Sequence, residues 1–308
     1  MQSAFPNGKR FAFTIFDDTD NATVDNVRPV YDLLKECGIR STKSVWVFPP
    51  RGDFSGSCLQ DPEYRDFVVD LQRAGFEIAL HNVGDGSFSR EEIRRGFDLF
   101  KQAIGHYPRS HTNHVSNPDN LYWWNERFEW PFSALYSLAS GKRSQRPGND
   151  PASPHFWGDL SKTHVKYIRN LTFNSINTTA IDSRMPYQER RKAEFSNFWF
   201  SSSDGHTVRE MNSLISRRNI DRLEEQGGAC IVYTHFASGY VDENGNLNSE
   251  FEKSIRYLAA KDGWFVPVCE LLDSLLESSG RGHDPGYFYK LKLNVRWFLD
   301  RLVKQIRH

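Results

Sequence analysis

Residues 11–18 read FAFTIFDD, a short run of aromatic, alanine and β-branched residues that ends in two adjacent aspartates. A short apolar run of this kind indicates a buried strand of a parallel sheet. Residues 24–37 follow with apolar side chains at helical spacing, and Gly38 supplies a helix stop signal. The chain therefore begins with a predicted strand–helix unit, and Asp17 and Asp18 lie where the strand ends.

The same alternation continues along the chain. We expect further strands over residues 44–48, 76–80, 109–114, 173–181, 229–233 and 264–268, and further helices over 62–74, 90–104, 214–226, 251–260 and 269–276. Strands that alternate with helices predict an α/β protein with a parallel sheet and right-handed crossovers. We expect one unit over residues 1–282, with an irregular, aromatic-rich insertion at roughly 118–200, and a separate tail over 283–308.

Composition narrows the classes of function. The chain has 308 residues, of which 38% are hydrophobic, and its 39 basic side chains balance its 39 acidic ones. A neutral balance argues against nucleic-acid binding as the main function. No apolar run approaches the ~20 residues of a membrane span, and residues 1–10 show no apolar leader. The scattered cysteines fit a reducing compartment, so we expect a cytoplasmic protein.

Ionisable side chains gather at the expected strand ends. Besides Asp17 and Asp18, these are His81, His114 and His235. The carboxyl ends of parallel strands are where α/β sheets and barrels build their sites. Of two adjacent carboxylates, one can hold a metal while the other acts as a base, and a strand-end histidine suits a general acid. Each residue alone has a plainer interpretation, as a helix cap or a hydrogen-bonded core side chain.

The order TIFDD (14–18), EIALH (77–81) and IVYTH (231–235) resembles the polysaccharide deacetylase family, also called the NodB homology domain or carbohydrate esterase family 4. The resemblance is that of a divergent member and covers roughly residues 8–276. It implies a distorted (β/α) barrel that uses one divalent transition metal to remove an N-acetyl group from a sugar. Zinc is the first expectation for that metal, ahead of cobalt, nickel, manganese or iron.

The resemblance also implies roles for particular residues. Asp17 would be the catalytic base, Asp18 and His81 would be metal ligands, and His235 would be the catalytic acid. The family's second metal histidine falls on Asp85, and its Arg-Pro-Pro-Tyr motif is replaced by the SHTNH segment over residues 110–114. The remaining ligand is therefore expected from Asp85 or His114.

The sequence also offers two candidate substrate-binding residues and two alternatives to the deacetylase function. The family's fourth motif is not clear in this chain. Trp157 and Asp159 are the candidates for the residues that support the substrate. The first alternative is a non-catalytic, sugar-binding barrel that has lost its metal. The second is a metal-dependent amidohydrolase of a small metabolite, because a fold does not fix a substrate.

The tail differs in character from the rest of the chain. Within residues 287–307, helical spacing among six basic residues is followed by Leu291, Val295, Phe298, Leu302 and Ile306. A basic amphipathic helix is typical of contact with a membrane surface or a partner, and packing on the barrel is the alternative.

The expected substrate is an acetylated sugar or glycan, nucleotide- or lipid-linked, for glycan or cell-surface polysaccharide biosynthesis. It would be met in the cytoplasm or at the inner face of the membrane.

Overall fold

The strands pair in parallel throughout and close on themselves. The computed structural model describes residues 5–141, 147–277 and 280–307. Its strands are β1 Phe11–Asp17, β2 Thr42–Val45, β3 Glu77–His81, β4 Ser110–Thr112, β5 Tyr167–Phe173, β6 Phe198–Asp204, β7 Ala229–Thr234 and β8 Gly263–Trp264. Each strand from β2 to β7 pairs with the next, and β1 closes the barrel by pairing with both β7 and β2. The short β8 lies beside the start of β1. The expected (β/α) barrel is confirmed.

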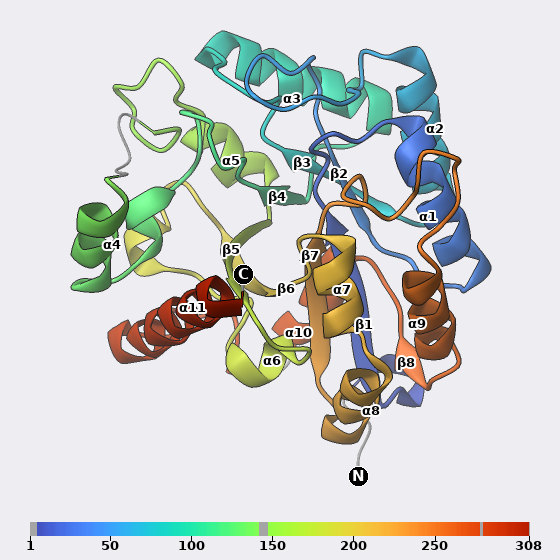
Figure 1. Cartoon of the computed structure of the whole chain (residues 1–308). Helices are drawn as coiled ribbons and strands as arrows, with labels where there is room; N and C mark the ends of the chain where they lie inside the picture. The colour runs from blue at the N-terminus through green and yellow to red at the C-terminus, as the bar shows by residue number, and fades with distance from the viewer. Residues whose placement is uncertain (1–4, 142–146, 278–279, 308) are drawn as a thin grey trace.

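Helices surround this barrel (Figure 1). They are α1 Val24–Glu36, α2 Pro62–Arg73, α3 Arg90–Ile104, α4 Phe132–Ser140, α5 Gly158–His164, α6 Thr178–Ile181, α7 Val208–Leu214, α8 Arg217–Gln226, α9 Ser249–Ala259, α10 Val268–Leu276 and α11 Tyr287–Arg307. Local signals explain their ends, as α3 shows. The Ser89 hydroxyl accepts from the Glu92 backbone while the Glu92 carboxylate accepts from the Ser89 backbone, and Gly105 ends the helix at φ 89°.

One barrel strand, β5, lies inside the segment over residues 118–200 that we expected to be irregular, and a second, β6, begins at the end of that segment. The strand expected over residues 173–181 is wrong: β5 ends at Phe173, and α6 follows it. Arg169 in β5 is only 7% exposed, and the serines of β6 are fully buried. Polar residues on a strand that is buried on both faces remove the apolar run by which such a strand is recognised.

The tail forms α11, which packs against β5 and lies beside α4 (Figure 1). Its buried face carries Lys290, Leu293, Asn294 and Trp297. Lys290 pairs with Glu129 at 2.7 Å, and the Asn294 side chain accepts a hydrogen bond from the Glu129 backbone. These tertiary partners rotate the helix away from the face that hydrophobicity alone predicts.

The opposite face of α11 is exposed. Of the predicted apolar stripe, Val295 is 42% and Leu302 is 55% exposed, while Phe298 packs against Phe128 and Phe132. Phe288, at 82% exposure, adds to this outer face. Among the helices that the structure describes, none has the length and apolar character needed to cross a bilayer.

Candidate metal centre

Three buried side chains direct one ligand atom each toward a common point. They are Asp20, in the loop after β1, His81, the last residue of β3, and His114, just beyond β4. The Nε2 atoms of His81 and His114 lie 3.2 Å and 3.3 Å from Asp20 Oδ1. None of these three atoms has a hydrogen-bond partner among the described residues. All three elements end at the carboxyl edge of the barrel, where closure brings them together.

The other ring nitrogens fix which atoms are free. His81 Nδ1 lies 3.0 Å from the Thr112 carbonyl oxygen, which can only accept, so Nδ1 carries the proton and Nε2 presents a lone pair. His114 Nδ1 faces Asn117 Oδ1 at 3.1 Å and Asp85 Oδ1 at 3.5 Å. In their neutral forms, the two imidazoles therefore direct one lone pair each toward the same point as a carboxylate oxygen. This donor set fits a divalent metal ion whose histidines are oriented from behind.

Asp85 lies behind the cluster. Its carboxylate is fully buried, contacts the His114 nitrogen that faces away from Asp20, and accepts a hydrogen bond from the Phe54 backbone at 2.9 Å. Of the two residues expected to complete the ligand set, the structure therefore brings His114 to the cluster and leaves Asp85 to orient it. A carboxylate behind a ligating imidazole fixes the ring and raises its basicity.

Asp18 is held by an arginine from the far side of the barrel. The Arg169 guanidinium makes two parallel contacts to its carboxylate, at 2.8 Å and 2.5 Å. Asp18 Oδ2 lies 3.9 Å from His81 Nε2, beside the cluster of Asp20, His81 and His114. Burial alone would raise the pKa of Asp18, but the positive charge of Arg169, followed by His81, lowers it. Asp18 is therefore an ionised carboxylate at the edge of the cluster.

Asp17 points to the opposite side of β1, into the layer between the barrel and α1. Its Oδ2 pairs with Lys43 Nζ at 2.8 Å and accepts the Tyr31 hydroxyl at 2.8 Å. Its Oδ1 accepts the Phe236 backbone N–H at 2.8 Å. Both Asp17 and Lys43 are fully buried. This geometry favours a structural ion pair over the catalytic base expected from the sequence.

His235 follows β7 and lies next to the cluster. Its Nε2 is 2.9 Å from Asp20 Oδ2, and its Nδ1 faces the His206 carbonyl oxygen at 3.4 Å. His235 lines the same cavity, of about 360 Å³, as Asp18, Asp20 and His81. The wall beyond them is aromatic and includes Trp123, Trp124, Tyr136 and Trp297.

The two expected substrate residues do not line this cavity. Trp157 is buried against His111, with ring centroids 4.9 Å apart, and its Nε1 donates to the Asp119 carbonyl. Asp159 pairs at the surface with Arg90 at 2.7 Å. Residues that are close to barrel strands in the sequence can still lie outside the barrel in space. Both Trp157 and Asp159 lie outside it.

Asp20 and Arg169 were missed by sequence reasoning. The signal for Asp20 was the alternation Phe16, Asp18, Asp20, because alternate residues of an extended segment share a face. The signal for Arg169 was a charge inside the strand YIRNLTF, which implies a buried partner without naming it.

A closed parallel barrel with a His/His/Asp cluster at its carboxyl end agrees with the distorted (β/α) barrel that the sequence resemblance implied. Among solved structures, it resembles PuuE allantoinase at a TM-score of 0.54 and 10% identity, covering 91% of this chain and 95% of that one. A candidate polysaccharide deacetylase from Mycobacterium smegmatis matches at 0.47 and 15%, covering 88% and 92%. A family 4 acetyl xylan esterase from Clostridium thermocellum, in complex with a cobalt ion, matches at 0.42 and 11%, covering 89% and 98%.

Neither a protein-family model nor a curated protein matches the chain. At these identities the structural likeness shows the fold, and the activity has to be argued from the site.

Proposed function

We propose that this chain is a metal-dependent amide hydrolase that removes the N-acetyl group from a sugar. The supporting observation is the convergence of Asp20 Oδ1, His81 Nε2 and His114 Nε2, three buried acceptor atoms without hydrogen-bond partners among the described residues. A divalent ion held there would polarise the amide carbonyl and make a water molecule easier to deprotonate.

We assign the catalytic base to Asp18 in place of Asp17. Asp18 lies beside the cluster, is ionised and lines the cavity, whereas Asp17 is enclosed by Lys43 and Tyr31. Asp18 would accept a proton from the attacking water while Arg169 keeps the carboxylate oriented. A base must lie within reach of the proton that it removes, and only Asp18 of the two meets this condition.

His235 would donate the proton to the leaving amine. It lines the cavity, and an imidazole titrates near neutral pH, so it can hold and release a proton there. The aromatic wall of Trp123, Trp124, Tyr136 and Trp297 supports a sugar substrate, since aromatic rings pack against the apolar faces of sugar rings.

The location and form of the substrate belong to the same proposal. The four cysteines, Cys37, Cys58, Cys230 and Cys269, are free thiols, as expected in a reducing compartment. We therefore propose a cytoplasmic, nucleotide- or lipid-linked acetylated sugar as the substrate. Zinc is the proposed metal, because two imidazoles and a carboxylate form a common zinc ligand set.

Hydrolysis of a small cyclic or linear amide is the second candidate. It is supported by the similarity to PuuE allantoinase over 91% of this chain. Acetate release from N-acetylated sugars, compared with hydrolysis of allantoin by the same metal-loaded protein, separates the two. A non-catalytic, sugar-binding barrel would bind sugar and show neither reaction.

Bound metal is the test of the proposal. Protein grown with added zinc and purified without chelator should hold about one ion per chain, and Asp20→Asn and His81→Ala should lose it. Asp18→Asn should keep the ion and lose acetate release. His111→Gln is the matched histidine control, since His111 packs against Trp157 outside the cluster, and it should keep the ion.

Two results would overturn this assignment. Zinc near zero in the native protein after reconstitution would remove the metal-dependent reaction and favour the sugar-binding barrel. Zinc retained in Asp20→Asn but lost in Asp18→Asn would return the ligand role to Asp18, as the sequence resemblance implied.

A further inference from the structure

Arg127 projects a guanidinium group into the candidate active-site cavity. It ends the short 3-10 turn Trp124–Arg127 and lines the same cavity as the metal cluster. Its Nε donates to Asn170 Oδ1 at 3.3 Å, and its Nη2 donates to the Asn170 backbone carbonyl. Both acceptors are neutral. Among the described residues, Arg127 makes no ion pair, and its Nη1 group has no hydrogen-bond acceptor.

Aromatic rings hold this guanidinium in place. Its central carbon lies 4.1 Å from the ring centroid of Trp123 and 5.8 Å from that of Trp297. Stacking on rings and two contacts to Asn170 fix the plane of the guanidinium, and Nη1 is left to meet a ligand. A preoriented guanidinium is the protein group best matched to the two oxygens of a carboxylate or phosphate.

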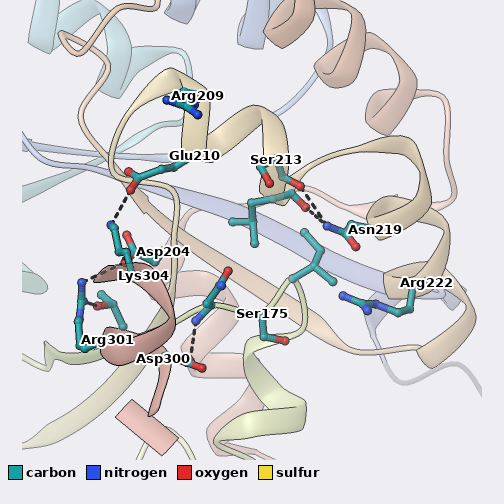
Figure 2. Close-up of a pocket in the computed structure, with 14 residues that line it drawn as sticks. Ser175, Asp204, Arg209, Glu210, Ser213, Asn219, Arg222, Asp300, Arg301 and Lys304 are labelled. Carbon is teal, nitrogen blue, oxygen red and sulfur yellow. Dashed lines mark hydrogen bonds and ion pairs between the residues drawn. The ribbon is translucent and has the colours of Figure 1, made fainter. Parts of the chain in front are cut away.

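The other cations near this cavity are already neutralised or hydrated. Arg169 pairs with Asp18, and Arg301 and Lys304 reach Asp204 at 3.3 Å and 3.2 Å. Figure 2 shows Arg301 and Lys304 beside Asp204 in the adjoining cavity, which shares these three residues with the active-site cavity. Arg209, which also lines the adjoining cavity, is exposed to water. Arg127 is the described cation in the active-site cavity that has neither a carboxylate partner nor full hydration.

A partly buried positive charge without a counter-ion is energetically unfavourable. Burial, followed by the positive charge of Arg301, lowers the pKa of Arg127. A bound divalent ion would add more positive charge than the single carboxylate of Asp20 offsets. The cavity as a whole is therefore complementary to a negatively charged ligand.

We propose that Arg127 binds a carboxylate or phosphate group of the substrate, so that this protein acts on an acidic acetylated sugar in preference to a neutral one. This inference rests on the proposed function, because it names the substrate class of the same cavity. Arg127 is its specificity residue and takes no part in proton transfer.

The test compares three sugars that share one N-acetylglucosamine core. N-acetylglucosamine is neutral, N-acetylmuramic acid adds a carboxylate, and N-acetylglucosamine 1-phosphate adds a phosphate. Dissociation constants are measured with the zinc-loaded full chain by calorimetry and by tryptophan fluorescence, to which Trp123 and Trp297 contribute. We expect an acidic sugar to bind about tenfold to hundredfold more tightly than the neutral one, the range for a charge-assisted hydrogen bond.

Variants attribute the preference to one residue. Arg127→Gln should lower the affinity for both acidic sugars to that for the neutral sugar while zinc content stays at the native level, and Arg127→Lys should keep part of the preference. Arg218→Gln, on the exposed surface of α8, is the matched arginine control and should bind like the native chain.

Two outcomes would overturn the inference: equal affinity of the native chain for all three sugars, weak or undetectable affinity included, or an unchanged preference in folded Arg127→Gln. The first comparison uses the native chain alone, so it still tests the inference if Arg127→Gln fails to fold. Because affinity and acetate release are measured separately, an Arg127-dependent preference without acetate release refutes only the proposed hydrolysis. Release from the neutral sugar without any preference refutes only the role of Arg127.

Discussion

Asp17, Asp18 and Asp20 lie within four residues of sequence and face three different environments. Asp17 faces Lys43 in the layer outside the barrel, Asp18 faces Arg169 within it, and Asp20 faces the histidines. Successive side chains of an extended segment point to opposite faces, so two adjacent carboxylates cannot share one site. The chemistry of each residue is decided by its partner, because all three have the same side chain.

We expect Asp17→Asn to lower the free energy of unfolding. The change leaves the Lys43 ammonium buried without a counter-charge, and breaking a buried ion pair in this way costs about 3–5 kcal/mol of unfolding free energy. Urea unfolding measures the loss, and the double variant Asp17→Asn/Lys43→Met should recover most of it. Folded Asp17→Asn should keep its zinc and its turnover. Loss of turnover at native stability would instead support Asp17 as the base.

We expect His235→Ala to lower the rate of acetate release. Removal of a positioned general acid lowers kcat by about 10²–10⁴-fold. Zinc content should stay at the native level, because the cluster of Asp20, His81 and His114 does not include His235. Acetate release and elemental analysis on the same preparation measure both quantities. A kcat within twofold of native would remove His235 from the reaction.

At the scale of elements, α11 is attached to the barrel by polar as well as apolar contacts. Leu293 and Trp297 pack into a small cluster with Phe128, Leu171 and Phe173. The Tyr289 hydroxyl donates to the buried Asp182 carboxylate at 2.9 Å, and Ser201 of β6 donates to the same carboxylate at 2.7 Å. Asp182 therefore connects α6, β6 and α11.

Asp182 should make stability depend on pH. Burial raises its pKa from 3.8 to about 6, so the folded chain binds this proton more tightly than the unfolded chain. The stabilisation is complete below the unfolded pKa and is lost as pH rises through about 6, a change of about 3 kcal/mol. Asp182→Asn cannot ionise, so its stability relative to the native chain should rise over this window.

Urea unfolding between about pH 4 and 7 measures this difference. Asp32→Asn is the control, because the Asp32 side chain is 58% exposed, and its effect should stay within about 0.5 kcal/mol at every pH. A constant difference between Asp182→Asn and the native chain across the window would show that Asp182 is not titrating there.

At the scale of the whole molecule, α4 and α11 present exposed apolar side chains near the aromatic wall of the cavity. Leu138 on α4 is 77% exposed, and Phe288 and Leu299 on α11 are 82% and 53% exposed. Tyr136 and Trp297, from the same two helices, line the cavity. A membrane surface on this side would bring a lipid-linked sugar to the cavity.

We therefore expect the native chain to float with vesicles that contain anionic lipid, and Phe288→Ser/Leu299→Ser to lose most of this binding. Neutral vesicles are the control and should bind less, because basic side chains on α11 contribute through charge. Flotation of the double variant at the native level, or none by the native chain, would contradict membrane contact by this face.

The order of strands and helices, and the ionisable residues at the strand ends, could be determined from the sequence. Both follow from local features: apolar runs, helical spacing and stop residues. β5 and β6 could not, because their buried residues include Arg169 and serines that only barrel closure gives partners.

The roles within the site depended on tertiary structure. Asp18 meets Arg169 across 151 residues of sequence, and the cluster draws on residues at or just beyond the ends of three separate strands. The sequence alone predicted that aspartates and histidines would gather at one edge of a parallel sheet. Which carboxylate faces the histidines, which is neutralised and which arginine lacks a counter-ion are long-range pairings, and no local pattern encodes them.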